Sequence, residues 1–177
     1  GIIEHMKDLY AFHAVVGYFR SSGYFALQPH LENIKEIKIL VGINVDQMFA
    51  EAQRKGLLYF GDENKTKDEF LKWFIQDIKE AKYSEQVEKG VLQFINDLME
   101  GRIEVRAHNS KAIHAKFYLF LPEKHTTHSD GWVIMGSSNL TEAGLGIKKS
   151  PNYELNIAWK DYDDVEFTKK EFIALWE

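Results

Sequence analysis

The sequence predicts an α/β domain in which helices flank a central mixed β-sheet. Apolar runs of strand length occur near the start of the chain and recur after residue 100, and three longer segments repeat apolar residues at helical spacing. Strands and helices that are mixed along one chain pack as layers on a shared sheet. A length of 177 residues suits one domain, so we expect a single domain over residues 1–177.

Two strands and a helix are expected in the first quarter of the chain. Residues 12–20 (FHAVVGYFR) and 36–43 (EIKILVGI) are apolar runs rich in β-branched and aromatic residues, which predicts strands. The segment between them, residues 21–31, predicts a turn that enters a short helix, with Ser21 or Ser22 as the capping residue.

Helices are expected in the middle of the chain, and strands dominate the part after residue 100. Residues 67–81 and 85–100 each place apolar side chains on one face of a helix. Four further strands are expected at residues 101–107, 113–120, 131–136 and 153–159. An amphipathic helix over residues 163–177 closes the chain.

The last strands are joined by two kinds of connection. The polar link between residues 120 and 131 suits a hairpin. After Gly136, the residues Ser138, Asn139 and Thr141 are types that cap helices, so we expect a short helix to start there.

Composition and charge limit the classes of function. A net charge of -5 and a pI of about 5.8 argue against a strongly basic protein that binds DNA of any sequence. Between Arg102 and Lys124, however, five basic residues outnumber two acidic ones, a local charge of +3. The absence of cysteine fits a cytoplasmic protein, and no apolar run of 18 residues predicts a membrane span. The first residues do not have the pattern of a signal peptide. Because the chain starts with Gly instead of Met, we expect an excised fragment or a tag scar, and a natural protein that is longer.

One expected strand carries two basic residues where burial is expensive. His114 and Lys116 lie two apart in the otherwise apolar segment KAIHAKFYLF. Side chains two apart on a strand point to the same face, so we expect these two to lie side by side. A neutral imidazole is a nucleophile near neutral pH, and an ammonium group holds a phosphate oxygen as a point charge.

Other polar residues lie at the ends of the following expected strands, namely Ser137, Ser138, Asn139, Glu154 and Asn156. Hydroxyl and amide groups donate hydrogen bonds to phosphoryl oxygens, and a carboxylate fixes the tautomer of an imidazole. If these strands are neighbours in one sheet, the groups converge with His114 and Lys116. Such a set predicts a phosphodiester site that uses no metal and no other cofactor.

These residues resemble the motif of the phospholipase D superfamily. HAK at 114–116, GSSN at 136–139 and NYE at 152–154 match, in order, the family's H-x-K, its G-S-x-N and the segment of its glutamate. Residues 12–43 also resemble the start of the phospholipase D-like domains that precede helicase or restriction modules in bacterial proteins. The resemblance implies a phospholipase D-like fold and a phosphodiesterase.

The resemblance also implies a role for each matching residue. His114 would attack phosphorus and form a phosphohistidine, and Glu154 would orient His114. The substrate phosphate would be bound by Lys116, Asn139, Ser137 and Ser138. No metal ligand is implied.

A partner is implied because the chain contains a single H-x-K sequence, whereas the family needs a second histidine as general acid. Single-motif members of the family form homodimers in which the two histidines face each other. An isologous dimer is the commonest oligomer of soluble proteins. We therefore expect a homodimer with His114 of each subunit at one shared site on the two-fold axis.

The sequence departs from the family pattern in two places. The family's aspartate would fall at position 121, which is Leu121 here. In addition, Gly136 follows Lys116 by 20 positions, about eight more than the pattern has, and the extra residues lie in the polar hairpin link. Insertions in a surface loop cost little, and neither departure removes a residue needed for phosphoryl transfer.

The expected function is a metal-independent nuclease attached to a helicase or restriction module, with DNA and RNA both open as substrate. The alternative is a catalytically weak module of the same fold that binds nucleic acid for an attached helicase. A lipid phosphodiesterase is disfavoured because no amphipathic segment has the basic face that binds membranes, so no membrane partner is expected.

Simpler interpretations stay open for several residues. Glu154 suits a surface charge, and Asn139 with the serines before it suits a turn and helix cap. A zinc site is raised, but disfavoured by the lack of cysteine, at His108, His125 and His128. Stacking on a substrate, or simple packing in the core, is open for Tyr18, Arg20 and Tyr24.

Overall fold

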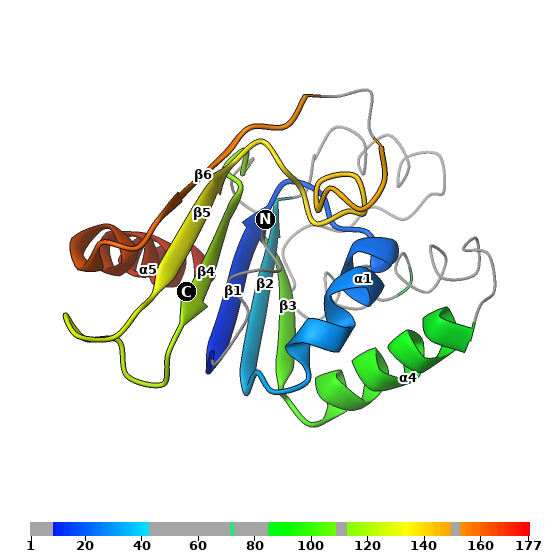
Figure 1. Cartoon of the computed structure of the whole chain (residues 1–177). Coiled ribbons are helices and arrows are strands. Elements are labelled where there is room, and N and C mark those ends of the chain that lie inside the picture. The colour runs from blue at the N-terminus through cyan, green and yellow to red at the C-terminus, as the bar shows by residue number, and fades with distance from the viewer. Residues whose placement is uncertain (1–8, 43–71, 73–84, 109–112, 150–152) are drawn as a thin grey trace.

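The computed structural model describes residues 9–42, 72, 85–108, 113–149 and 153–177 (Figure 1). Its strands are β1 Ala11–Val16, β2 Glu36–Gly42, β3 Ile103–His108, β4 Phe117–Leu121, β5 Trp132–Gly136 and β6 Asn156–Trp159. Its helices are α1 Ser21–Leu31, α4 Glu85–Met99 and α5 Tyr162–Trp176. Apart from Lys72, the helix expected at 67–81 lies outside the described residues.

The six strands form one mixed sheet in the order β3-β2-β1-β4-β5-β6. β1, β2 and β3 are parallel neighbours, whereas β4, β5 and β6 continue the sheet from β1 as antiparallel neighbours. Parallel strands need a crossover connection, which α1 supplies between β1 and β2. The polar link between β4 and β5 joins antiparallel neighbours, so the expected hairpin is confirmed.

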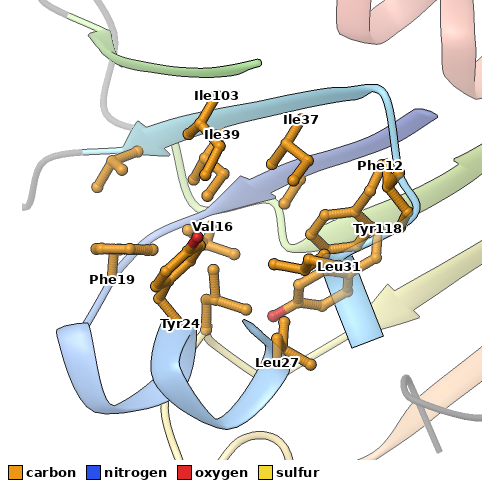
Figure 2. Close-up of a cluster of buried hydrophobic side chains, with 14 of the residues drawn as sticks. Phe12, Val16, Phe19, Tyr24, Leu27, Leu31, Ile37, Ile39, Ile103 and Tyr118 are labelled. Carbon is orange, nitrogen blue, oxygen red and sulfur yellow. The ribbon is translucent and has the colours of Figure 1, made fainter. Parts of the chain in front are cut away.

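Helices cover both faces of the sheet, which confirms the predicted α/β architecture. α1 and α4 lie on one face and α5 lies on the other (Figure 1). Figure 2 shows the core under α1, where Tyr24, Leu27 and Leu31 face side chains of the sheet. On the opposite face, Val165 and Phe172 of α5 pack on a second buried cluster. Each large apolar side chain that is fully buried contributes about 1.5–3 kcal/mol relative to exposure.

The apolar runs are longer than the strands because three of them continue into segments that leave the ladder. The expected strand 12–20 ends at Val16, and the expected strand 113–120 begins only at Phe117. The register pairs Val15 with Phe117, and Gly17 and Tyr18 then turn away from β4 toward Asn139. In the same way, the expected strand 153–159 begins only at Asn156.

Two expected features of the loops are wrong. The cap position of α1 is held by Arg20 and not by Ser21 or Ser22, and the Arg20 carbonyl accepts the N–H groups of Gly23 and Tyr24. The helix expected after Gly136 is a series of turns, in which Thr141 Oγ1 accepts the N–H of Gly144 at 3.0 Å. The chain there packs against α1 instead of extending as a helix.

A buried polar network closes the end of the sheet at which β2 and β3 begin. Asp97 of α4 is 1% exposed and accepts hydrogen bonds from Arg102 Nε at 2.8 Å, from Arg102 Nη2 and from Gln93 Nε2 at 2.8 Å. Arg102 Nη1 also donates to the carbonyls of Leu31 and Ile34, at 2.7 and 2.8 Å. The network therefore ties α4, β3 and the link between α1 and β2 together.

Among the described residues, no helix is both long enough and apolar enough to cross a bilayer.

Candidate active site

The candidate residues lie at one end of the sheet because of the directions in which the strands run. The carboxyl ends of β1 and β5 and the amino ends of β4 and β6 meet at this end. Lys116 comes just before β4, and its carbonyl accepts the N–H of Gly136 at the end of β5 at 3.1 Å. Gly136 in turn pairs with Asn156, the first residue of β6. Segments from both halves of the chain therefore meet here.

Lys116 and Asn139 flank the same point, which is the backbone of Gly17 just after β1. A Cβ atom on Gly17 would lie 3.6 Å from Lys116 Nζ and 3.5 Å from Asn139 Oδ1. Because Gly17 has no side chain, the space between the two polar groups stays open. An ammonium and an amide beside such a space are groups suited to bind an anion with several oxygens.

Hydrogen bonds fix both side chains in place. The backbone N–H of Tyr18 donates to Asn139 Oδ1 at 2.9 Å, so the oxygen end of the amide is bound to the backbone and Nδ2 is its donor end. Lys116 Nζ donates to the carbonyl of His114 at 3.1 Å, and an ammonium has three donors in all. Each group thus uses one hydrogen bond for its orientation and keeps donors for an anion.

Ser137 and Glu154 form a second pair at the same end of the sheet. Ser137 Oγ donates to Glu154 Oε2 and accepts the N–H of Leu155 at 3.0 Å. The backbone N–H of Ser137 also donates to the carbonyl of Leu155, at 3.1 Å. Burial, and secondly the negative charge of Glu154, raise the pKa of the Tyr118 hydroxyl. The negative charge of Glu154 therefore influences Tyr118 in β4, close to Lys116 in the chain.

Ser138 does not fit its expected role in binding substrate. Its side chain is fully buried, and its Oγ accepts a hydrogen bond from Asn156 Nδ2 at 2.8 Å. Tyr118 donates its hydroxyl to the Ser138 carbonyl at 2.8 Å. Ser138 therefore joins the loop to β4 and β6. Asn156, which the sequence placed among the polar groups expected to converge on the phosphate, completes this contact.

His114 lies in the irregular segment before β4 and is exposed to solvent. The spacing of His114 from Lys116 predicted that both residues lie in a strand, but the structure places His114 outside the strand. The segment is held on both sides, because Lys116 bonds the His114 carbonyl and the neighbouring Ile113 is buried against Gly42 at the end of β2. A Cβ on Gly42 would come within 2.6 Å of Ile113 Cβ, so only glycine lets Ile113 pack so closely.

The structure thus brings together Lys116 with Asn139, and Ser137 with Glu154, at the end of the sheet where His114 is exposed. Their catalytic roles stay predictions. The parts that Gly17 and Tyr18 play were not predicted from the sequence. The signal for them was the glycine that directly follows the apolar run of β1, since a glycine there allows close approach to the backbone.

The other histidines and aromatic residues have different surroundings. His125 Nδ1 lies 2.7 Å from Glu166 Oε1, and this hydrogen bond lowers the pKa of the Glu166 carboxyl. His128 is exposed in the hairpin, and the described residues contain no group of three metal-ligating side chains. Tyr24 is fully buried in the core, as the simpler interpretation held.

A model of a protein family described as "Cardiolipin synthase, PLD-like domain" matches residues 36–176 of this chain. The match includes every candidate residue from His114 to Glu154. It begins at the first residue of β2, so β1 and the Gly17–Tyr18 segment precede it. No curated protein matches the chain.

Proposed function

The chain belongs to the family of phospholipase D-like domains, and from that premise we propose that it is a nuclease that cleaves phosphodiester bonds without a metal ion. The family supports a phosphodiesterase in general terms. The observation that carries the proposal is the open space over Gly17, which is flanked by Lys116 and Asn139. A phosphodiester has two non-bridging oxygens, one for the ammonium and one for the amide.

The proposed reaction has two displacements at phosphorus. An imidazole nitrogen of His114 forms a bond to phosphorus while the bond to the leaving oxygen breaks, and a general acid protonates that oxygen. Water then attacks the phosphohistidine, which releases the phosphate ester and restores His114. Lys116 and Asn139 stabilise the charge that grows on the non-bridging oxygens in both steps. Glu154, held by Ser137, supports the orientation of His114.

The general acid in this proposal is His114 of a second subunit. Support comes from the start of the edge strand β6, where Leu155 just before the strand and Ile157 within it are 58% and 52% exposed. Exposed apolar side chains that lie together commonly mark an interface. We infer that a second copy of the chain packs on the edge strand β6 and brings its own His114 to the shared site.

The dimer is tested by sedimentation at several protein concentrations. Ile157→Lys places a charge in the proposed interface and should give monomers that have lost their activity. Phe167→Lys is the matched control, because Phe167 is 63% exposed on α5 and is not part of β6. A monomer that is active before any substitution contradicts the dimer.

The nuclease is tested with labelled single-stranded and duplex DNA and RNA in the presence of EDTA. Cleavage should continue in EDTA and should fall at least about a thousandfold in His114→Ala, since the nucleophile is lost. His128→Ala changes an exposed histidine in the hairpin and should leave cleavage unchanged. Full dependence on added metal, or unchanged cleavage by His114→Ala, would reject the proposal.

Two neighbouring functions are distinguished by the same protein preparation. A helicase-attached module that only binds nucleic acid would yield no phosphohistidine when a slow substrate is used to trap it. The family description names cardiolipin synthase, so head-group release from phospholipid vesicles is the direct check for a lipid substrate. We favour nucleic acid because residues 12–43 resemble the start of the phospholipase D-like domains that precede helicase or restriction modules.

A further inference from the structure

We propose that Asn156 is a positioning residue that holds the Asn139 amide in place at the phosphate site. The inference rests on the proposed function, because it adds a residue to the same site. It is carried by two hydrogen bonds between Asn156 and Ser138, by the burial of Ser138, and by the place of Ser138 directly before Asn139 in the chain.

Both ends of the Asn156 side-chain amide are bonded to Ser138. Its Nδ2 donates to Ser138 Oγ at 2.8 Å, and its Oδ1 accepts the backbone N–H of Ser138 at 3.4 Å. Ser138 is 0% exposed, so its hydroxyl and its N–H need partners within the chain. Asn156 supplies a partner for each of them, although Asn156 itself lies in the exposed edge strand β6.

The third polar group of Ser138, its carbonyl, is bonded to the neighbouring strand β4. Tyr118 donates its hydroxyl to this carbonyl at 2.8 Å. Burial raises the pKa of Tyr118, so the hydroxyl keeps its proton and remains a donor. All three polar groups of Ser138 are therefore bonded, and the backbone that leads to Asn139 is fixed from both β4 and β6.

Two glycines allow the close packing around this part of the loop. Gly136 pairs with Asn156 in the ladder between β5 and β6, and a Cβ on Gly136 would collide with Asn156 Oδ1. The Asn156 side chain thus uses the space over Gly136 to reach Ser138. Beyond the site residue, a Cβ on Gly144 would collide with the Asn139 carbonyl oxygen. The Asn139 backbone is therefore held on both sides.

The direction of the Asn139 amide decides whether it can bind a phosphoryl oxygen. The Tyr18 N–H fixes its Oδ1 at 2.9 Å, and the contacts of Ser138 fix the backbone from which the side chain starts. An amide that is held in advance costs less to order when a ligand binds, and it stabilises growing charge without rearrangement. Asn156 therefore acts on the reaction through Asn139, without touching the substrate.

The first test reports the position of Asn139 without any substrate. The Tyr18 N–H that donates to Asn139 Oδ1 should exchange slowly with deuterated water, and NMR measures its rate. Asn156→Ala should speed this exchange by roughly tenfold, because Asn139 then leaves the Tyr18 N–H more often. The Arg102 N–H donates to the Asp97 carbonyl at 2.9 Å at the opposite end of the sheet and should exchange as in the parent.

Asn96→Ala is the matched control for the loss of an amide side chain. Asn96 Nδ2 donates to Glu100 Oε1 at 3.2 Å on α4, and its removal should leave the exchange of the Tyr18 N–H unchanged. Tyr118→Phe is the second variant, used if Asn156→Ala does not fold. It removes only one hydroxyl and should also speed the exchange of the Tyr18 N–H. Exchange at the parent rate in that variant would then overturn the inference.

The second test uses the kinetics of phosphodiester cleavage in EDTA to separate positioning from a general loss of structure. Asn156→Ala should lower kcat about tenfold with little change in KM, because the Asn139 amide acts on the charge of the transition state. In a chain that already carries Asn139→Ala, adding Asn156→Ala should cost less than about twofold. A general loss of structure would reduce cleavage equally in both backgrounds.

The inference is overturned if the Tyr18 N–H exchanges freely in the parent, or at the parent rate in Asn156→Ala. It is also overturned if Asn156→Ala speeds the exchange of Tyr18 and Arg102 equally, or reduces cleavage equally with and without Asn139. The nuclease proposal fails by a different result, which is the absence of His114-dependent cleavage. A chain that does not cleave, but protects the Tyr18 N–H through Asn156, would refute the nuclease and retain the positioning of Asn139.

Discussion

The two ends of the sheet both hold charged side chains, but they use them differently. At one end, Asp97 and Arg102 are tied to each other and to carbonyls of the α1–β2 link, so their hydrogen-bonding groups are occupied within the protein. At the other end, Lys116 and Asn139 each use one hydrogen bond for orientation and face the open space over Gly17. Polar groups whose hydrogen bonds are all made within the chain contribute to stability. Polar groups that are held in one orientation but keep hydrogen-bond donors can bind a ligand.

The largest effect is expected from breaking the end that holds Asp97 and Arg102. Asp97→Ala leaves Arg102 largely buried without its carboxylate, so the free energy of unfolding should fall by about 3–5 kcal/mol. Urea denaturation followed by circular dichroism measures this. Glu104→Gln, which removes an exposed ion pair with Arg106, is the control and should change stability by less than about 1 kcal/mol. Equal losses of unfolding free energy in the two variants would mean that the network of Asp97 and Arg102 contributes no more to stability than an exposed ion pair.

Breaking the open end should affect activity and leave stability unchanged. Lys116→Met keeps the length of the side chain but removes its positive charge. The rate of phosphodiester cleavage should fall about 10²–10³-fold, as when one stabilising donor is lost from a transition state. Urea denaturation of the same variant should agree with that of the parent within about 0.5 kcal/mol. A loss of stability comparable to that of Asp97→Ala would erase the contrast between the ends.

Filling the open space over Gly17 is expected to have a smaller effect on activity. A Cβ at this position would make ordinary contacts with Lys116 and Asn139, so Gly17→Ala should fold and lose less than about threefold in kcat/KM. Gly17→Val adds two methyl groups to the same space and should lose roughly tenfold or more. Identical kinetics for the parent and Gly17→Val would show that the phosphate lies elsewhere.

The smallest effect is a pH dependence at the end that holds Asp97 and Arg102. His13 is buried under Phe172 of α5, and its Nε2 is 2.6 Å from Glu36 Oε1, while Nδ1 is buried without a hydrogen-bond partner. Burial lowers the pKa of His13 below its usual 6.5, although Glu36 opposes the shift. The unfolded chain therefore takes up a proton first as the pH falls below about 6.5, and stability decreases in that range.

His13→Gln keeps a donor for Glu36 and removes this titration. Between pH 7.5 and pH 5.5, the melting temperature should fall more in the parent than in the variant, and differential scanning calorimetry measures both. Parallel decreases would assign the pH dependence to groups other than His13. Burial acts to raise the pKa of Glu36, but the hydrogen bond with His13 and the nearby Lys38 together lower it.

Much of the fold followed from local patterns. The helix predicted at 85–100 is α4, and the closing helix predicted at 163–177 is α5, because both repeat apolar residues at the spacing of helical turns. The strand ends were less predictable. The apolar character of residues 113–116 and 153–155 continues past the point where the neighbouring strands diverge, and local composition does not record that point.

The candidate site shows the same division. The order of HAK, GSSN and NYE predicted the family, and the family match confirmed it. The two adjacent serines could not be told apart in this way. Ser137 meets Glu154, whereas Ser138 is buried against Asn156, because successive residues at the end of a strand point in opposite directions.

The sequence by itself determined the α/β class, most of the helices and strands, and the set of polar residues that marks the phospholipase D-like family. Only the tertiary structure decided that Tyr18 orients Asn139, a residue 121 positions away, and that Gly17 is the floor between Asn139 and Lys116. The physical reason is the strand order: β1 lies beside β4 in the sheet, and no local pattern of residues specifies which distant strands become neighbours.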